Sequence, residues 1–310
     1  MRSSPVPPRP SHPHPRSHLY VPADQPRFLR SAARTEADAV ILDLEDAVAP
    51  LHKDAARAAA VGFALGRQDG GPERGPELWV RVNGGARGLD DARALLATGR
   101  VDGLWMPKAS AGAELDTLAA AVGAAVTSTG GSVALGLLVE SAAGVLSLGT
   151  AARHPAVRRI QLGEVDLRAD LRMEPDSARG DDLLDWARGP VVAHAVAHGL
   201  ECAVAPVSVH TSDSAAFRAS SLRLRALGFR GRACIHPHQV TVANEVFGTD
   251  PTELADAHAL LDLFERHERD GSGAFRDGRG AMVDAATVRR ARDLTGRAVA
   301  RTHEDRPDRT

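Results

Sequence analysis

Two carboxylates, Glu140 and Asp166, stand at the ends of short apolar segments, where a side chain is free to do chemistry. Glu140 follows the apolar run 133–139, and Asp166 comes three residues after the run 159–163. In a barrel of alternating strands and helices, the carboxyl ends of all strands open on one face. Two acids there, one strand–helix unit apart, can share one hard divalent cation. We therefore expect a Mg²⁺ site on Glu140 and Asp166, with Mn²⁺ as an alternative ion.

Charged residues also follow other apolar runs. Arg81 carries a planar guanidinium that suits a substrate carboxylate or enolate oxygen, so we interpret it as catalytic and substrate-binding. The alternative is an ordinary ion pair between Arg81 and the two metal-site acids. Glu45 and Asp46 are too close in sequence to face the same way on an extended strand. We expect one of them to order Lys108 or a water on the metal, and the other to cap the next helix.

Two further features near these strand ends concern binding and a rival mechanism. The backbone N–H groups around Gly163, Val165 and Asp166 could hold a substrate carboxylate in an anion nest. Lys108, one of only two lysines in the chain, could form a Schiff base with a carbonyl substrate. The metal hypothesis does not need such a base, so the Schiff-base mechanism ranks second.

The composition argues against several classes of function. The 310 residues are 43% apolar, and a formal net charge of −2 gives no electrostatic reason to expect nucleic acid or membrane binding. No run approaches the roughly 20 apolar residues that span a bilayer, and the N-terminus lacks the apolar stretch of a secretory signal. The two cysteines lack C-x-x-C spacing, which fits a reducing compartment. We expect a cytoplasmic protein.

Short apolar runs alternate with segments of helical period along most of the chain. Eight alternating strands and helices predict an α/β fold, the (β/α)8 TIM barrel with a C-terminal helical extension. A doubly wound open sheet is the alternative, but no G-x-G-x-x-G follows any strand. The expected strands are 18–21, 39–44, 78–83, 103–106, 133–139, 159–163, 201–205 and 233–236.

The domain organisation follows from these elements. The Pro- and His-rich residues 1–15 read as a disordered tail, and residues 16–248 as the barrel. Residues 249–300 contain two further helical patterns that a barrel does not need, so they are expected to form a lid or to pack on a neighbouring subunit. Residues 301–310 read as a frayed tail.

Ordered sequence segments resemble the citrate lyase β-subunit-like family, which includes malyl-CoA and citramalyl-CoA lyases and belongs to the HpcH/HpaI aldolase/citrate lyase superfamily. The match runs from residue 16 to residue 239, with a further similar segment in the tail. The matching segments are RSHLYVP (16–22), AVILDLEDAV (39–48), RVN (81–83), MPK (106–108), ESAAGV (140–145), GEVDLRADL (163–171), CIHPHQ (234–239) and GAMVD (280–284).

The resemblance implies a homotrimer or a dimer of trimers, with Mg²⁺ on the two acids and Arg81 on a substrate oxygen. It also implies that Asp284 enters a neighbouring subunit's site as an acid–base residue. Arg16 would meet CoA phosphates, and Pro206 would contact substrate at the rim. The chain departs from the family at Val165, where an acid is frequent, and around Pro206, where the usual Pro-Ile-Asp pattern is absent.

The expected function is that of a Mg²⁺-dependent carbon–carbon lyase. It would cleave or form a 3-hydroxy-3-acyl-CoA such as malyl-, citramalyl- or citryl-CoA, giving an acyl-CoA and a 2-oxo acid. One alternative is an aldolase, of Schiff-base or metal type, acting on a 2-oxo acid substrate without CoA. Another is a non-catalytic subunit of a lyase complex. The expected partners are the acyl-CoA and the 2-oxo acid, with no nucleic acid and no membrane.

Overall fold

The computed structural model describes residues 14–67, 75–129, 132–174, 180–269, 274–278 and 280–304. The chain divides into two compact units, the barrel unit Pro15–Phe247 and a second unit that contains Gly248–Thr310. The tail predicted for residues 1–15 lies almost entirely outside the described residues. Within the described residues, no helix is long and apolar enough to cross a membrane.

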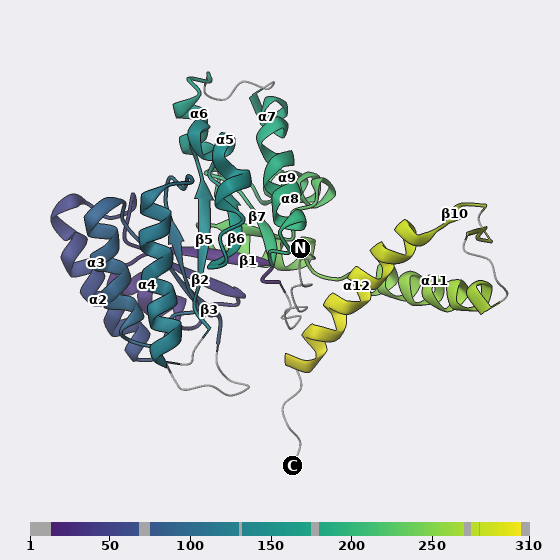
Figure 1. Cartoon of the computed structure of the whole chain (residues 1–310), viewed down its shortest axis with the longest axis horizontal. Helices are drawn as coiled ribbons and strands as arrows, with labels where there is room; N and C mark the ends of the chain where they lie inside the picture. Colours follow the sequence, from purple (N-terminus) through teal and green to yellow (C-terminus); the bar gives the residue numbers. More distant parts are fainter. Residues whose placement is uncertain are drawn as a thin grey trace, which may run out of the picture. The chain divides into compact units, whose positions relative to one another are not determined.

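Eight parallel strands close into a barrel in the order in which they occur along the chain, as the sequence predicts (Figure 1). The last strand ends two residues earlier than the sequence predicts: Ile235 lies outside the strand, and His236 is the N-cap of the next helix. The strands are β1 (Ser17–Pro22), β2 (Ala39–Asp43), β3 (Glu77–Arg81), β4 (Gly103–Met106), β5 (Ala134–Val139), β6 (Val157–Leu162), β7 (Cys202–Ala205) and β8 (Gly231–Cys234).

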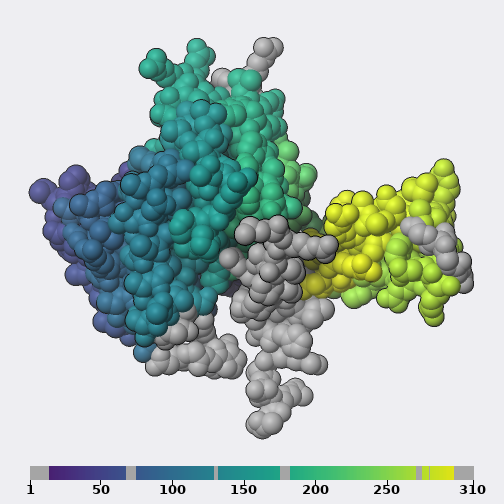
Figure 2. Space-filling view, in the orientation of Figure 1, coloured from purple at the N-terminus to yellow at the C-terminus, as the bar shows by residue number. Residues whose placement is uncertain are grey.

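Helices connect successive strands and form the outer surface of the unit on the face seen in Figure 2. Side chains accept from orphan backbone N–H groups where three of them begin: Ser141 caps α5, Asp213 caps α9 and His236 caps α10. The elements are α1 (Pro26–Ala32), η1 (Pro50–His52), α2 (Lys53–Leu65), α3 (Gly85–Leu96), α4 (Ala113–Thr129), α5 (Ala142–Ala151), α6 (Glu164–Asp170), α7 (Gly180–Leu183), α8 (Asp185–Ala197), α9 (Ser214–Leu227) and α10 (Pro237–Val246).

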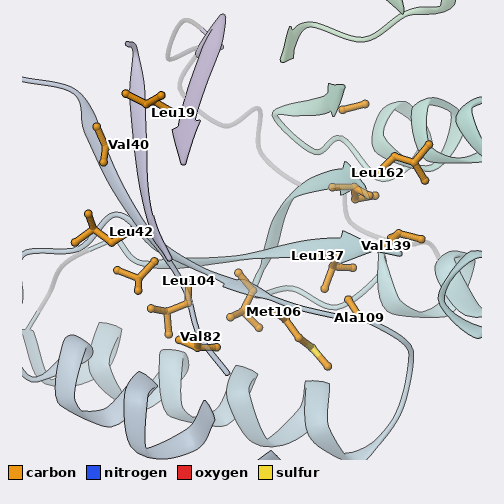
Figure 3. Close-up of a cluster of buried hydrophobic side chains, with 14 of the residues drawn as sticks. Leu19, Val40, Leu42, Val82, Leu104, Met106, Ala109, Leu137, Val139 and Leu162 are labelled. Carbon is orange, nitrogen blue, oxygen red and sulfur yellow. The ribbon is translucent and has the colours of Figure 1, made fainter. Parts of the chain in front are cut away.

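The main apolar core lies between the strands and the helices that cover them (Figure 3). Because side chains alternate along a strand, residues such as Leu42, Leu104 and Leu137 face the helices and are fully buried. The scarcity of aromatic residues leaves this layer to Leu, Val and Ala. Its burial fixes the strands, and therefore fixes the direction in which the alternate residues point into the barrel.

Two tryptophans fill the barrel interior. The rings of Trp79 and Trp105 are both fully buried, with centroids 5.4 Å apart. Glycines on the next strands make room for them, since a Cβ on Gly103 would lie 2.2 Å from the Trp79 ring and a Cβ on Gly136 would lie 2.4 Å from the Trp105 ring. The interior is therefore packed below the mouth, and any open space must lie above this layer.

The second unit has a small core of its own, made by Phe264, Val283 and Val288. Its two long helices, α11 (Pro251–Arg269) and α12 (Ala285–Glu304), lie side by side (Figure 1). Between them lies a short antiparallel hairpin of β9 (Phe275–Arg276) and β10 (Met282–Val283). Helix α12 continues beyond residue 300, into the segment that the sequence predicts to be frayed.

Candidate active site

Glu140 and Asp166 line one cavity of about 850 Å³ at the carboxyl ends of the strands. Glu140 directly follows β5 and is 2% exposed, while Asp166 lies in the first turn of α6 and is partly buried. Burial raises the pKa of Glu140 to about 7, and the negative charge of Asp166 contributes to this rise. The two acids are therefore close enough to repel each other, which a shared cation would relieve.

The backbone around Glu140 is shaped to leave space for its carboxylate. A Cβ on Gly163 would lie 2.7 Å from Glu140 Cβ and 2.9 Å from Oε2, so only glycine fits there. On the other side, the backbone N–H of Lys108 donates to Glu140 Oε1 at 2.7 Å. Lys108 adopts φ of +45°, a left-handed conformation that is unfavourable for a residue with a side chain. The fold thus fixes one oxygen of Glu140, a residue that lines the cavity.

The residues present fit a magnesium ion. Among the described residues no group of three or more His, Cys, Asp or Glu side chains could hold a metal. Mg²⁺ does not need such a cage, since proteins commonly bind it through one or two carboxylates, with waters or substrate oxygens completing the shell. Glu140 and Asp166, with the cavity beside them, match this pattern.

Arg81 is held by Asp43, a partner that the sequence reasoning did not assign. Arg81 Nε donates to Asp43 Oδ1 at 2.7 Å, and Nη2 donates to Oδ2 at 2.6 Å. Nη1 approaches Glu45 Oε2 at 3.2 Å. The alternative in which Arg81 pairs with Glu140 and Asp166 is wrong for the described structure. Arg81 lines the cavity, and after the cost of burial its pKa is still raised by the Asp43 carboxylate, so the charge is permanent.

Glu45 and Asp46 both face Lys108, so the expectation that one of them caps a helix is wrong. Lys108 Nζ donates to Glu45 Oε1 at 2.7 Å and lies 3.8 Å from Asp46 Oδ2. Burial and the hydrogen bond with Glu45 raise the pKa of Asp46 to about 6. Lys53 secures the loop by donating to the carbonyl oxygens of Leu44 and Glu45, at 2.8 Å and 2.6 Å.

The setting of Lys108 disfavours a Schiff base. A nucleophilic lysine needs a lowered pKa, so that a neutral amine is available near neutral pH. Burial lowers the pKa of Lys108, but the hydrogen bond to Glu45 and the charge of Asp46 outweigh it, and the pKa is raised. Lys108 therefore acts as a fixed positive charge that organises the Glu45–Asp46 pair.

Comparisons with known proteins identify the family of this chain. Residues 16–237 match the family described as HpcH/HpaI aldolase/citrate lyase. The chain belongs to this family. An L-malyl-CoA/beta-methylmalyl-CoA lyase of Rhodobacter capsulatus is 32% identical over 309 residues, covering 91% of this chain and 94% of that protein. A (3S)-malyl-CoA thioesterase of Cereibacter sphaeroides is 34% identical over 289 residues, covering 92% and 93%.

One similar solved structure is that of protein CitE from Mycobacterium tuberculosis in complex with magnesium, acetoacetate and coenzyme A. It is 30% identical, has a TM-score of 0.70, and the alignment covers 94% of this chain and 99% of that one. A citrate lyase β subunit from the same organism, complexed with oxaloacetate and magnesium, is also 30% identical, with a TM-score of 0.60 and coverage of 77% and 98%.

Of the other predicted site residues, some line the cavity and some do not. Gly163 and Val165 line the same cavity as the two acids. Pro206 is buried directly after β7, beside the lining residue Val207, and its carbonyl oxygen accepts from Arg232 at 3.2 Å.

Arg16 lies away from this mouth, and Asp284 belongs to the second unit. Arg16 precedes β1, at the opposite end of the strands, and pairs with Asp38 at 2.8 Å, so its expected role at the rim is wrong. Asp284 is exposed in the second unit, where its Oδ1 accepts from the backbone N–H groups of Ala286 and Thr287 and caps α12.

Sequence reasoning missed a buried pair beside the two acids and a hydrogen bond across the barrel. Glu164 lines the cavity and forms a bidentate pair with Arg188 of α8, at 2.6 Å and 2.9 Å, which anchors the start of α6. Tyr20 and Gln161 also line the cavity. The signal for Gln161 was available, because it is a polar residue at an inward position of an otherwise apolar strand end.

Proposed function

We propose that this chain is a Mg²⁺-dependent carbon–carbon lyase acting on a CoA thioester. Its substrate would be a 3-hydroxyacyl-CoA with a carboxylate on the hydroxylated carbon, of the malyl-, citramalyl- or citryl-CoA type. The products would be an acyl-CoA and a 2-oxo acid, and the reverse condensation uses the same groups. The observation that carries the proposal is the pair of carboxylates, Glu140 and Asp166, in one cavity beside a permanently charged arginine. The named activities and complexes of the relatives support it.

The chain's own residues supply distinct parts of this chemistry. When bound by Glu140 and Asp166, Mg²⁺ would supply a positive charge for the hydroxyl and carboxylate oxygens of the substrate. The hydroxyl loses its proton, the adjacent carbon–carbon bond breaks, and its electron pair passes to the acyl-CoA half as an enolate. We assign stabilisation of the developing negative charge to Arg81, and its two hydrogen bonds to Asp43 support this role by fixing the guanidinium. The Glu45–Asp46–Lys108 group provides carboxylates that can take up the proton.

Protonation of the enolate carbon needs an acid besides the two carboxylates that we propose as metal ligands. We assign this role to Asp284 of a neighbouring subunit, in a homotrimer or hexamer. Its exposure and its position in a separate unit support such a role in trans. A cytoplasmic location belongs to the same proposal, in keeping with two buried free cysteines, Cys202 and Cys234.

A second candidate is hydrolysis of the thioester, because one relative at 34% identity is named a (3S)-malyl-CoA thioesterase. The two reactions leave different products from malyl-CoA. A lyase releases a 2-oxo acid and keeps the thioester, whereas a thioesterase releases a free thiol and malate.

One assay therefore separates them. The purified protein is incubated with malyl-, citramalyl- or citryl-CoA, with Mg²⁺ or with EDTA, and both 2-oxo acid and free thiol are followed. The proposal expects 2-oxo acid without equivalent thiol, abolished by EDTA and restored by Mg²⁺. Thiol release without 2-oxo acid supports the thioesterase. Full 2-oxo acid release in EDTA contradicts the metal-dependent mechanism.

A further inference from the structure

A hydrogen bond crosses the lumen of the barrel directly at the cavity. The hydroxyl of Tyr20, on β1, donates to Oε1 of Gln161, on β6, at 3.0 Å. These strands are not neighbours, because β1 pairs with β2 and β8. The two side chains therefore reach toward each other through the interior, and both line the cavity. We call the Tyr20–Gln161 pair the crossbar.

The crossbar forms part of the cavity floor. Tyr20 packs on the interior cluster that contains Trp79 and Trp105, so that apolar layer lies on its other side. The Arg81 guanidinium carbon lies 5.3 Å from the centre of the Tyr20 ring. The charges of Arg81, Asp43 and Glu140 all act on the Tyr20 phenol. The crossbar is thus close to the groups that the proposed reaction uses.

Gln161 has hydrogen-bonding capacity that the protein does not use. Its Oε1 accepts from Tyr20, which orients the amide and leaves both N–H groups of Nε2 with no acceptor among the described residues. Gln161 is 2% exposed, yet Nε2 is not a fully enclosed atom, so its remaining access is to the cavity. Buried amide donors without an acceptor are rare in proteins unless a ligand or water serves them.

Gln239 shows the usual arrangement for a buried glutamine in this fold. It is also 2% exposed, but its Oε1 accepts from the backbone N–H of Ile235 at 2.8 Å and its Nε2 donates to the carbonyl oxygen of Ser208 at 2.9 Å. Gln239 does not line the cavity. The difference between the two glutamines is that Gln161 keeps its donors toward the open space.

We propose that Gln161 Nε2 donates to a carboxylate oxygen of the 2-oxo acid half of the substrate, and that Tyr20 is the positioning residue that orients this amide. The inference rests on the proposed lyase function and names a residue that recognises the oxo acid. In the described structure Arg81 already donates to Asp43, so a neutral donor on the floor complements the charged groups. A neutral donor strengthens when its acceptor is ionised, which selects a carboxylate.

This contact would exist both before and during bond cleavage, because the carboxylate itself does not react. Interactions present equally in the ground state and the transition state change affinity and leave kcat nearly unchanged. If Gln161 only supported the metal site, its substitution would change kcat as well. Comparing the change in KM with the change in kcat therefore distinguishes substrate recognition from structural support.

The first experiment compares Gln161→Met with the matched control Gln239→Met. Dissociation constants for glyoxylate, pyruvate and oxaloacetate are measured by calorimetry with Mg²⁺ present, together with kcat, KM and Tm. For Gln161→Met we expect at least tenfold weaker 2-oxo acid binding, the factor that corresponds to about 1.4 kcal/mol, with kcat changed less than threefold. For Gln239→Met we expect the larger loss of Tm, because two protein hydrogen bonds are removed, and unchanged 2-oxo acid affinity in the folded protein.

Two further variants test the direction of the hydrogen bond and the role of Tyr20. Gln161→Glu places an acceptor where a donor is needed, so it should weaken 2-oxo acid binding at least as much as Gln161→Met. Tyr20→Phe keeps the ring on the floor but frees the amide, so it should weaken binding less. Adding it to Gln161→Met should cause no further loss, because both changes act through one contact.

The outcomes are separable. If the wild-type protein shows Mg²⁺-dependent cleavage while Gln161→Met keeps wild-type affinity for every 2-oxo acid, the inference is overturned and the lyase function stands. Unchanged or improved binding in Gln161→Glu also overturns it, since the cavity-facing atom would then be an acceptor. If the wild-type protein neither binds a 2-oxo acid nor cleaves any of the three thioesters, the proposed function fails and the inference fails with it.

Discussion

Replacing Glu140 by glutamine should stabilise the metal-free protein while removing its activity. Glu140 is 2% exposed, and burial together with the charge of Asp166 raises its pKa from 4.5 to about 7. At about 1.4 kcal/mol per pKa unit, ionised Glu140 costs the folded state about 3 kcal/mol. Glutamine is neutral, and its Oε1 can still accept from the backbone N–H of Lys108. We expect Glu140→Gln to unfold with a free energy about 2–3 kcal/mol higher at pH 8 in EDTA.

The sign of the pH dependence follows from the raised pKa. The stability that protonated Glu140 contributes is fully present below pH 4.5 and is lost as the pH rises through 7. The difference between the variant and the wild type should therefore be largest at pH 8 and should shrink toward pH 5. Saturating Mg²⁺ should reverse the order, because it stabilises only the protein that binds it.

The assay is urea unfolding at pH 5 and pH 8, in EDTA and in Mg²⁺, with Glu164→Gln as the matched control. Glu164 is a buried neighbour whose carboxylate is paired with Arg188, so removing its charge should destabilise the protein under every condition. If Glu140→Gln is less stable than the wild type at pH 8 in EDTA, the reasoning about an uncompensated buried carboxylate is refuted.

Four further substitutions test separate parts of the site. Gly163→Ala should weaken Mg²⁺ binding at least tenfold by calorimetry, because its Cβ would meet the Glu140 carboxylate at 2.9 Å; unchanged affinity would contradict this. Lys108→Arg should retain activity, and borohydride should trap no substrate on the wild type; trapping on Lys108 would instead support the aldolase. Arg81→Lys and Asp284→Asn should each lower kcat at least 100-fold. Mixed oligomers that contain both variants should regain activity, because one subunit then supplies Arg81 and its neighbour supplies Asp284. No recovery in the mixed oligomers would argue against a site shared between subunits.

The fold could be predicted because local signals and the global architecture agree. Apolar runs of strand length alternate with helical periods, and a parallel barrel is the arrangement that buries both. The error at β8 has a local cause. The backbone at His236 is extended, so the segment resembles a strand, but Pro237 begins a helix there and His236 serves as its N-cap rather than pairing in the sheet.

The site was predictable where a residue's place in the chain fixes its place in the barrel. Glu140 directly follows a strand, so strand direction alone brings it to the mouth. The same rule, applied to Arg16, would have placed it at the opposite end, because it precedes its strand. The Tyr20–Gln161 contact could not be predicted from strand direction. It forms only when the barrel closes and brings together two residues that are 141 positions apart in the sequence.

The central claim is that Glu140 and Asp166 bind one divalent ion between them. Calorimetric titration of Mg²⁺ into the wild type, Glu140→Gln and Asp166→Asn, each with a 2-oxo acid present, tests it most directly. The account predicts one ion per chain in the wild type and loss of that binding in either variant alone. Wild-type affinity in either variant would contradict it.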